Sequence, residues 1–251
     1  MSDPKPRYGY NAEPRLSANQ LSDYLTATPP RRKTIIRDAK YPKTSVVARY
    51  SGAREAIGEY LCDDLRNSKV LYEGVESIKT REAKFTATDW TKQDCALSVE
   101  AIEAFQSAYN SLGLAKISCR AIVTKQPKLQ IEGVGVSVAL DGTTHRTGKN
   151  GEKCVGGLIL LFSKSEASAK NREARCKTSA VLAAVFSEQH LAYLGQADPK
   201  ICYALDVFGK RIFPAPNMFP TKLDHMRAAC EEVALRWDHI DPPTDYDGPN
   251  F

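Results

Sequence analysis

Residues 128–140, KLQIEGVGVSVAL, and residues 154–163, CVGGLILLFS, decide the fold. Apolar side chains mostly alternate with small or polar ones in the first run, which predicts a strand with one buried face. The second run is apolar throughout, which predicts a strand that is buried on both faces. The polar, glycine-rich residues 141–153 lie between the two runs. We therefore predict a long β-hairpin in a sheet that is at least partly antiparallel.

Helical periodicity surrounds this hairpin, because apolar residues recur there at steps of three and four. Ser17 and Gln20 form a capping box at the start of the first helix, and Pro30 suits the first position of the second. We expect helices over residues 17–26, 31–40, 51–65, 70–79, 91–112, 166–191 and 221–237. Shorter strands are expected over residues 116–123, 201–207 and 210–213.

These patterns predict an α+β protein, with a helical N-terminal half followed by a partly antiparallel sheet that helices cover. The chain of 251 residues shows no repeats or low-complexity linkers, which favours a single domain over residues 16–240. Residues 16–113 of it should be mainly helical, and residues 114–240 should hold the sheet and its helices. Residues 1–15 are rich in Pro, Arg and Tyr and are expected to be flexible, and residues 241–251 form an acidic tail.

The composition is that of an ordinary globular protein, with 42% apolar and 26% charged residues. Seven scattered cysteines, none in a C-x-x-C pair, indicate reduced and buried thiols. No N-terminal signal segment is visible, and no apolar run approaches the roughly 20 residues that span a bilayer. We therefore expect a cytoplasmic protein without a membrane partner.

The net charge of +5 is unevenly distributed along the sequence. Residues 1–50 hold ten Lys and Arg against four acids, so the basic excess is N-terminal. A local basic patch attracts polyanions more strongly than dispersed charge does, and we predict DNA or RNA as the partner. A solvated helix surface is the alternative. The candidate nucleic-acid contacts are Arg31, Arg32, Lys33, Arg37 and Lys40 on the second helix, and Arg146 and Lys149 in the hairpin turn.

Two other signals are weaker. The run GTTHRTGKN (142–150) has five residues between its glycines where a phosphate-binding loop needs four, and Asn150 replaces the Ser or Thr that would bind magnesium. We interpret it as a hairpin turn. Asp206 lies in an apolar strand, where it is either a site residue or a partner of the backbone at the turn of Gly209. We favour the second interpretation.

A carboxylate and lysine set is the main candidate for catalysis. Glu132 lies early in the first hairpin strand, Asp141 ends it, and Lys164 ends the second strand. Metal-dependent nucleases place a strand-borne acid beside a lysine of the neighbouring strand. The acid then holds Mg²⁺ or Mn²⁺, and the lysine orients the attacking water and stabilises charge on the phosphate.

Four stretches resemble a group of uncharacterised bacterial proteins. They are LSANQLSDYLTATPPRR (16–32), DAKYP (38–42), GGLILLFSK (156–164) and AACEEVALRW (228–237). The likeness extends over most of the chain and implies no particular activity.

The strand–turn–strand–helix order also looks like the core of the PD-(D/E)XK nucleases. In that family an acid ends the first hairpin strand, and an acid-x-lysine triplet lies on the second. Asp141 matches the first acid and Lys164 the lysine, but Phe162 stands where the second acid belongs. Glu152, at the start of the second strand, is the acid available to replace it. The resemblance implies either a phosphodiesterase that uses Asp141, Lys164, Glu132 and Glu152, with Asp141 on the metal, or an inactive relative with the same fold.

Three functional hypotheses follow. The first is a nucleic-acid-associated protein with a nuclease-like core, active or inactive. The second is a non-enzymatic subunit of a larger assembly, which docks on a partner through exposed tyrosines. Those tyrosines are Tyr8, Tyr10, Tyr24 and Tyr41. The third is a small-molecule enzyme, favoured if a pocket collects Glu132, Asp141, Asp206 and Lys164.

Overall fold

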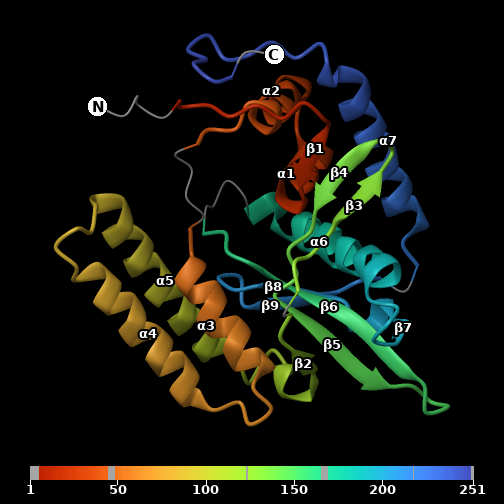
Figure 1. Cartoon of the computed structure of the whole chain (residues 1–251). Helices are drawn as coiled ribbons and strands as arrows, with labels where there is room; N and C mark the ends of the chain where they lie inside the picture. The colour runs from red at the N-terminus through yellow and green to blue at the C-terminus, as the bar shows by residue number, and fades with distance from the viewer. Residues whose placement is uncertain (1–5, 45–48, 123, 165–168, 217, 250–251) are drawn as a thin grey trace. The chain divides into compact units, whose positions relative to one another are not determined.

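The computed structural model of the chain describes residues 6–44, 49–122, 124–164, 169–216 and 218–249, and Figure 1 shows its elements. It confirms the α+β class, with helices first, a sheet in the middle and a helix at the end. The chain divides into two compact units. The first unit contains Met1–Val47, Gln126–Val138 and Met218–Phe251, and the second contains Ala48–Lys125 and Ala139–Asn217. That the two units act as one domain stays a prediction.

The first unit combines a small sheet with three helices. Its elements are β1 (Arg15–Ser17), α1 (Ala18–Thr26), α2 (Pro29–Lys40), β3 (Lys128–Ile131), β4 (Val134–Ser137) and α7 (Pro220–Trp237). The strand order is β1-β4-β3, with β1 parallel to β4 and β3 antiparallel to it. Helix α7 packs against β3, β4 and α1. The sheet therefore joins chain segments that are more than a hundred residues apart in sequence.

The start of α1 follows from its capping residues. The amide of Gln20 donates to Ser17 Oγ at 3.2 Å, and the amide of Ser17 donates to Gln20 Oε1 at 2.9 Å. These bonds satisfy two donors that a helix start would otherwise leave open. Helix α2 begins with two prolines, whose fixed φ suits a first helical turn and whose missing N–H is not needed there. The predicted start of α1 is confirmed, whereas α2 begins at Pro29, one residue before the predicted Pro30.

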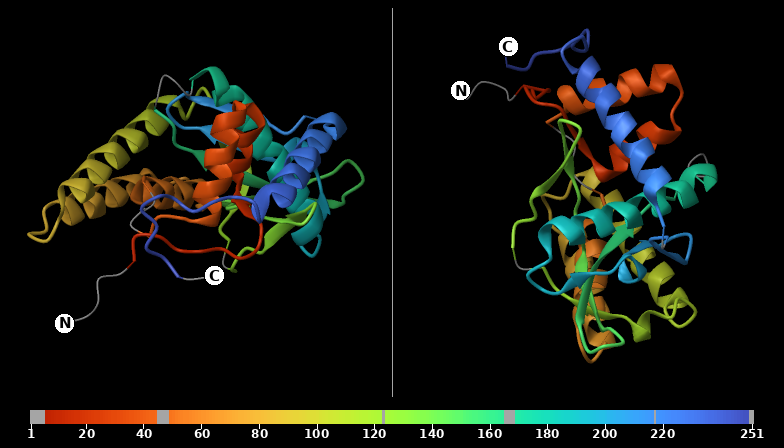
Figure 2. Two further views of the ribbon diagram at one scale, coloured as in Figure 1. Left: turned by 90° about the horizontal axis from the view of Figure 1, so that it is seen from above. Right: turned by 90° about the vertical axis from the view of Figure 1, so that its right-hand side faces the viewer.

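The N-terminal segment makes specific contacts within the first unit. Tyr8 is buried, and the amide of Gly9 donates to the carbonyl of Pro42 at 2.8 Å. Arg7 Nε lies 2.9 Å from Asp247 Oδ2, so the acidic tail binds the N-terminal segment. Figure 2 shows the two terminal segments side by side. From Arg7 onward this segment therefore contacts Pro42 and the carboxylates of the tail, while its flexibility stays a prediction.

The second unit contains a larger mixed sheet. Its helical elements are α3 (Ser51–Cys62), α4 (Ser68–Glu82), α5 (Asp89–Ala108), η1 (Leu114–Lys116), α6 (Ala169–His190) and η3 (Pro199–Ile201). Its strands are β2 (Ser118–Arg120), β5 (Gly142–Thr147), β6 (Lys153–Leu161), β7 (Gln196–Ala197), β8 (Tyr203–Asp206) and β9 (Arg211–Pro214). The strand order is β2-β5-β6-β8-β9, and β7 pairs with the start of β6. β6 runs parallel to β7 and β8, and the other pairs are antiparallel.

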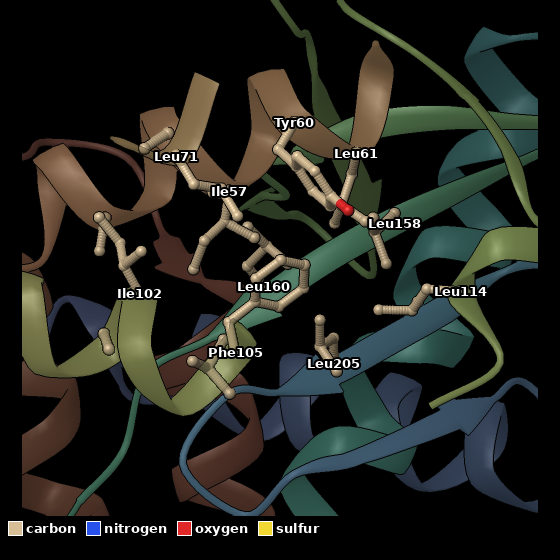
Figure 3. Close-up of a cluster of buried hydrophobic side chains, with 14 of the residues drawn as sticks. Ile57, Tyr60, Leu61, Leu71, Ile102, Phe105, Leu114, Leu158, Leu160 and Leu205 are labelled. Carbon is tan, nitrogen blue, oxygen red and sulfur yellow. The ribbon is translucent and has the colours of Figure 1, made fainter. Parts of the chain in front are cut away.

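Helices lie on both faces of this sheet. Helix α6 packs against β6, β8 and β9, and α3 packs against β2 and β5 (Figure 1). Figure 3 shows the core on the α3–α5 side, where Ile57 and Phe105 meet Leu158, Leu160 and Leu205. Successive strand residues point to opposite faces, so a strand buried on both sides must be apolar throughout. The sequence of β6 meets this requirement.

The structure contains a long antiparallel hairpin, but its first strand is not the predicted one. Residues 128–140 break at Glu132 and Gly133, whose φ values are 44° and 77°, so they form the short hairpin β3–β4 of the first unit. Two consecutive residues with positive φ make a tight turn and cannot continue a strand. β6 pairs instead with β5, which lies within residues 141–153 that we expected to be a turn. The turn itself is confined to residues 148–152.

The second predicted hairpin is confirmed. β8 and β9 pair antiparallel, with Asp206 opposite Arg211. Asp206 Oδ1 accepts the N–H of Gly209 at 2.8 Å, which confirms the backbone role favoured from the sequence. Among the helices of the described residues, none combines the length and the apolar character needed to cross a bilayer.

Candidate functional site

Asp141, the predicted metal ligand, forms a buried ion pair. Arg54 Nη1 donates to both of its carboxylate oxygens, at 2.6 and 2.7 Å, and the amide of Leu160 donates to Oδ2 at 2.6 Å. Arg54 Nη2 also donates to the carbonyl of Leu160 at 2.9 Å. Burial raises the pKa of Asp141, while Arg54 and the Leu160 amide counter that rise. These hydrogen bonds of Arg54 join the first turn of α3 to the sheet.

This geometry does not fit a divalent cation. Arg54 Nη1 donates to both carboxylate oxygens, and a guanidinium repels a second cation. Within the described parts of the chain, His, Cys, Asp and Glu nowhere gather in a group of three that could hold a metal ion. We assign Asp141 a structural role.

Within the second unit, Lys164 and Glu152 bind partners other than Asp141. Lys164 Nζ lies 2.7 Å from Glu100 Oε2 of α5. Glu152 lies in the turn at the far end of the β5–β6 ladder, where it accepts the amide of Asn150. Along the β5–β6 ladder, Glu152 lies seven residues from the position of Asp141. This separation is roughly 20 Å at about 3.3 Å per residue. Glu132 belongs to the turn of the first unit. Asp141 and Glu152 are therefore too far apart to hold one metal ion together.

Some of the basic side chains of α2 bind partners within the first unit. Lys40 is buried, and its Nζ donates to the carbonyl of Trp237 at 2.7 Å, so the prediction that it contacts phosphate is wrong. Arg32 pairs with Glu232 at 3.0 Å. Arg31 and Lys33 are exposed, and Arg37 is partly buried. In the second unit, Arg146 forms an ion pair with Asp198, while Lys149 is exposed in the hairpin turn.

The four tyrosines predicted to dock a partner are mostly internal. Tyr8, Tyr24 and Tyr41 are buried, and the ring of Tyr10 lies 5.8 Å from that of Tyr41. The prediction that these side chains form an exposed contact surface is therefore wrong. They stabilise the first unit.

The charge balance changes when it is counted by unit instead of by segment. The first unit has 13 Lys and Arg against 12 acids, because α7 and the acidic tail belong to it. The second unit has 22 Lys and Arg against 18 acids, a net charge of +4. Most of the positive excess therefore lies in the second unit, which carries the larger sheet.

Several of these cations gather where the parallel strands β6 and β8 end. Asp206, at the end of β8, is buried and lies 3.2 Å from Arg172 Nε of α6. Arg172 Nη2 also donates to the carbonyl of Ser163 at 2.9 Å, which brings the start of α6 to the end of β6. Arg211 stands opposite Asp206 in the ladder. We call this group the basic edge; its cations are Lys164, Arg172, Arg175, Lys177, Lys210 and Arg211.

Among the residues that the structure describes, the basic edge holds more cations than acids. Its six cations face three acids, Asp206, Glu173 and Glu100. Burial raises the pKa of Asp206, and the amide of Gly209 and the neighbouring arginines counter that rise. Burial likewise raises the pKa of Cys176 to about 12, so this thiol is not a nucleophile at neutral pH. The edge can bind an anion but offers no activated nucleophile there.

Three aromatic rings lie at the same edge. Phe162 follows β6 and Phe208 follows β8, and Tyr50 stacks on Phe162 with ring centroids 5.3 Å apart. The ring of Phe208 meets Tyr50 edge-on at 5.7 Å, and the guanidinium of Arg54 lies 5.2 Å from the centre of Phe162. All three residues are partly exposed, and they pack against the hydrophobic core of the second unit. The edge therefore combines cations with aromatic surface.

Sequence reasoning missed this edge, although its signals were present. Residues 172–177 contain Arg172, Arg175 and Lys177 in the first turns of a helix that follows an apolar strand. In open α/β sheets, ligands bind at the carboxyl ends of parallel strands. The basic edge is recognisable only when β6 and β8 are known to be parallel neighbours. The prediction of an antiparallel hairpin from the sequence did not include this pairing.

The fold and the site define an α+β protein with a mixed sheet and a cationic, aromatic strand edge. No model of a known protein family matches this sequence. A comparison with curated proteins finds no match either.

Proposed function

We propose that the protein binds nucleic acid, as a single strand, at the basic edge of the second unit. The observation that carries the proposal is the position of its cations, which lie at the carboxyl ends of β6 and β8 beside the start of α6. Helix N-termini and arginine forks both favour phosphate oxygens. Lys210 and Arg211 are exposed and available for such contacts.

The aromatic rings favour a single strand over a duplex. Proteins that bind single strands combine a cationic groove with rings on which unpaired bases stack. Tyr50, Phe162 and Phe208 supply partly exposed rings within the basic edge. Bases paired inside a duplex cannot reach such rings, so duplex DNA should bind more weakly.

The proposal assigns binding and no reaction. The Arg54–Asp141 ion pair removes the acid that a metal-dependent nuclease would need, so nuclease activity stays a prediction without support from this geometry. The partner is the one predicted from the sequence, a nucleic acid. The proposed contact surface is the basic edge and not α2.

Fluorescence anisotropy with a labelled oligonucleotide of about 16 nucleotides tests the proposal. Binding should weaken steeply between about 50 and 200 mM salt, because phosphate contacts release counterions. The double variant Lys210→Ala/Arg211→Ala should lower the affinity by about tenfold and reduce the salt slope by about 2. The matched control Arg31→Ala/Lys33→Ala removes the same charge from α2 and should change the affinity much less.

A second candidate function is protein binding, which a different observation favours. Leu65, Tyr72 and Phe85 are 85%, 64% and 105% exposed, on α4 and the loops at its two ends. Leu65 and Phe85 flank opposite ends of α4, so an interaction surface that includes all three side chains would extend along this helix. Size-exclusion chromatography with the proteins encoded nearby tests this candidate; a complex that Tyr72→Ser/Phe85→Ser abolishes would support it.

A further inference from the structure

Two cysteines from distant parts of the second unit lie in contact. Cys62 is the last residue of α3 and Cys119 is the middle residue of β2, 57 positions later. Their Sγ atoms are 3.2 Å apart. A disulfide bond needs about 2.05 Å between the sulfurs, so the pair is about 1 Å from bonding distance.

The neighbouring strand is shaped around the two sulfurs. Gly142, the first residue of β5, packs beside both of them. A Cβ atom at this position would overlap Cys119 Sγ and lie 3.1 Å from Cys62 Sγ. Glycine therefore provides the space that the pair occupies.

The two thiols differ in access and in acidity. Cys62 is partly exposed, whereas Cys119 is 4% exposed. The hydrogen bond between the two sulfurs lowers the pKa of Cys62, burial opposes that shift, and the guanidinium of Arg66 adds a smaller lowering contribution. Arg66 is fixed there because its Nη2 donates to the carbonyl of Ile117 at 2.6 Å. The same hydrogen bond and burial raise the pKa of Cys119. Cys62 is thus suited to react first and Cys119 to resolve the product.

We propose that Cys62 and Cys119 form a redox-modification site whose substrate is a low-molecular-weight disulfide such as oxidised glutathione. The thiolate of Cys62 attacks one sulfur of that disulfide. A mixed disulfide forms, and the first thiolate leaves and takes up the proton that Cys62 lost. Cys119 then loses its proton and attacks Sγ of Cys62, which expels the second small thiol. Two protein thiols are oxidised to one disulfide, and the small disulfide is reduced to two thiols.

The cross-link would tie the end of α3 to strand β2. The chain between the two cysteines contains α4 and α5, so the disulfide would close a long loop around the helical layer of the second unit. Closing a long loop restricts the unfolded chain. Oxidation should therefore raise the midpoint of thermal unfolding by about 5–10 °C.

Peptide mapping of the oxidised full-length protein is the test. The reduced chain is incubated with mixtures of reduced and oxidised glutathione, quenched with acid and digested without reductant. The expected product links the Cys62 and Cys119 peptides before any other pair appears. Cys119→Ser should stop at a mixed disulfide of one glutathione on Cys62, and Cys62→Ser should leave Cys119 unmodified.

Cys154→Ser is the matched control, because it removes a buried thiol and should leave the cross-link intact. The proposal would be overturned if Cys62 and Cys119 remained free thiols after other cysteines had reacted. A Cys62 mixed disulfide that persists in the wild-type protein would do so as well. The peptide map of the wild-type protein decides the proposal without any variant. The test therefore stays decisive if a variant fails to fold.

Discussion

Asp141 illustrates how neighbouring residues determine the role of a carboxylate. Its position at the end of an apolar run suggested a metal ligand, but the structure places Arg54 on both of its oxygens. Arg54 lies 87 positions earlier in the chain, so no local sequence pattern could indicate the pairing. Buried charges are found with a partner because an unpaired one is costly.

The ion pair makes a stability prediction. Arg54→Ala should lower the free energy of unfolding by about 2–3 kcal/mol, because it leaves the buried Asp141 carboxylate without its cation. The value is below that of a fully buried pair, since the side chain of Arg54 is 38% exposed. Urea unfolding followed by circular dichroism measures it.

Lys69→Ala is the matched control for Arg54→Ala. Lys69 forms an exposed ion pair with Glu73 one helical turn away, so its loss should cost less than about 0.5 kcal/mol. Equal midpoints for the two variants would show that the Asp141 pair does not stabilise the fold.

At the scale of elements, local signals were sufficient for the helices. Capping at Ser17, proline at the start of α2 and the apolar stripes of α3, α5 and α7 predicted helices close to the observed ones. Strand pairing could not be predicted in the same way. It depends on which segment lies beside β6, and the alternation in residues 128–140 did not reveal the positive φ of Glu132.

Helix packing in the second unit depends on a glycine. A Cβ on Gly74 of α4 would lie 2.5 Å from the Cβ of Ala56 on α3, closer than two carbon atoms can pack. Gly74→Ala should destabilise the protein by about 1–3 kcal/mol, because overpacking outweighs the gain in helix propensity. Thermal and urea unfolding measure the change.

Gly58→Ala on α3 is the contrasting substitution. A Cβ there meets the carbonyl oxygen of Asp141 at 3.7 Å, an ordinary contact. The helix should therefore gain up to about 1 kcal/mol. If both alanine variants are stabilised, the close approach of α3 and α4 is not as described.

At the scale of the whole molecule, charge must be counted in space. The basic first fifty residues suggested a polyanion surface, yet in the first unit Glu232, Asp245 and Asp247 face arginines of that segment. These acids lie about two hundred positions away in sequence. The excess charge is found in the second unit, which sequence segments alone did not single out.

The contact between the chain ends can be tested by hydrogen exchange. Asp247 Oδ1 accepts the amides of Arg7 and Tyr8, at 2.8 and 3.2 Å. In Asp247→Ala these two amides should exchange about tenfold faster, because both lose their acceptor. Asp241→Ala removes the same charge from the tail and should leave both amides protected. Unchanged exchange in Asp247→Ala would contradict the described contact.

The basic edge could have been predicted in part. The cluster of Arg172, Arg175 and Lys177 is visible in the sequence, but Asp206 and Arg211 join it through a parallel strand pairing and a crossover helix. The aromatic members were hidden for a different reason. Phe162 and Phe208 follow apolar strands, where a sequence pattern does not distinguish a core ring from an edge ring.

The central claim is that the basic edge binds a single-stranded nucleic acid, and a salt titration of oligonucleotide binding tests it most directly. The affinity of the wild-type chain should fall steeply between about 50 and 200 mM salt. Lys210→Ala/Arg211→Ala should make that fall shallower, while Arg31→Ala/Lys33→Ala should leave it nearly unchanged. No binding at the lower salt concentration, or equal losses in the two double variants, would contradict the claim.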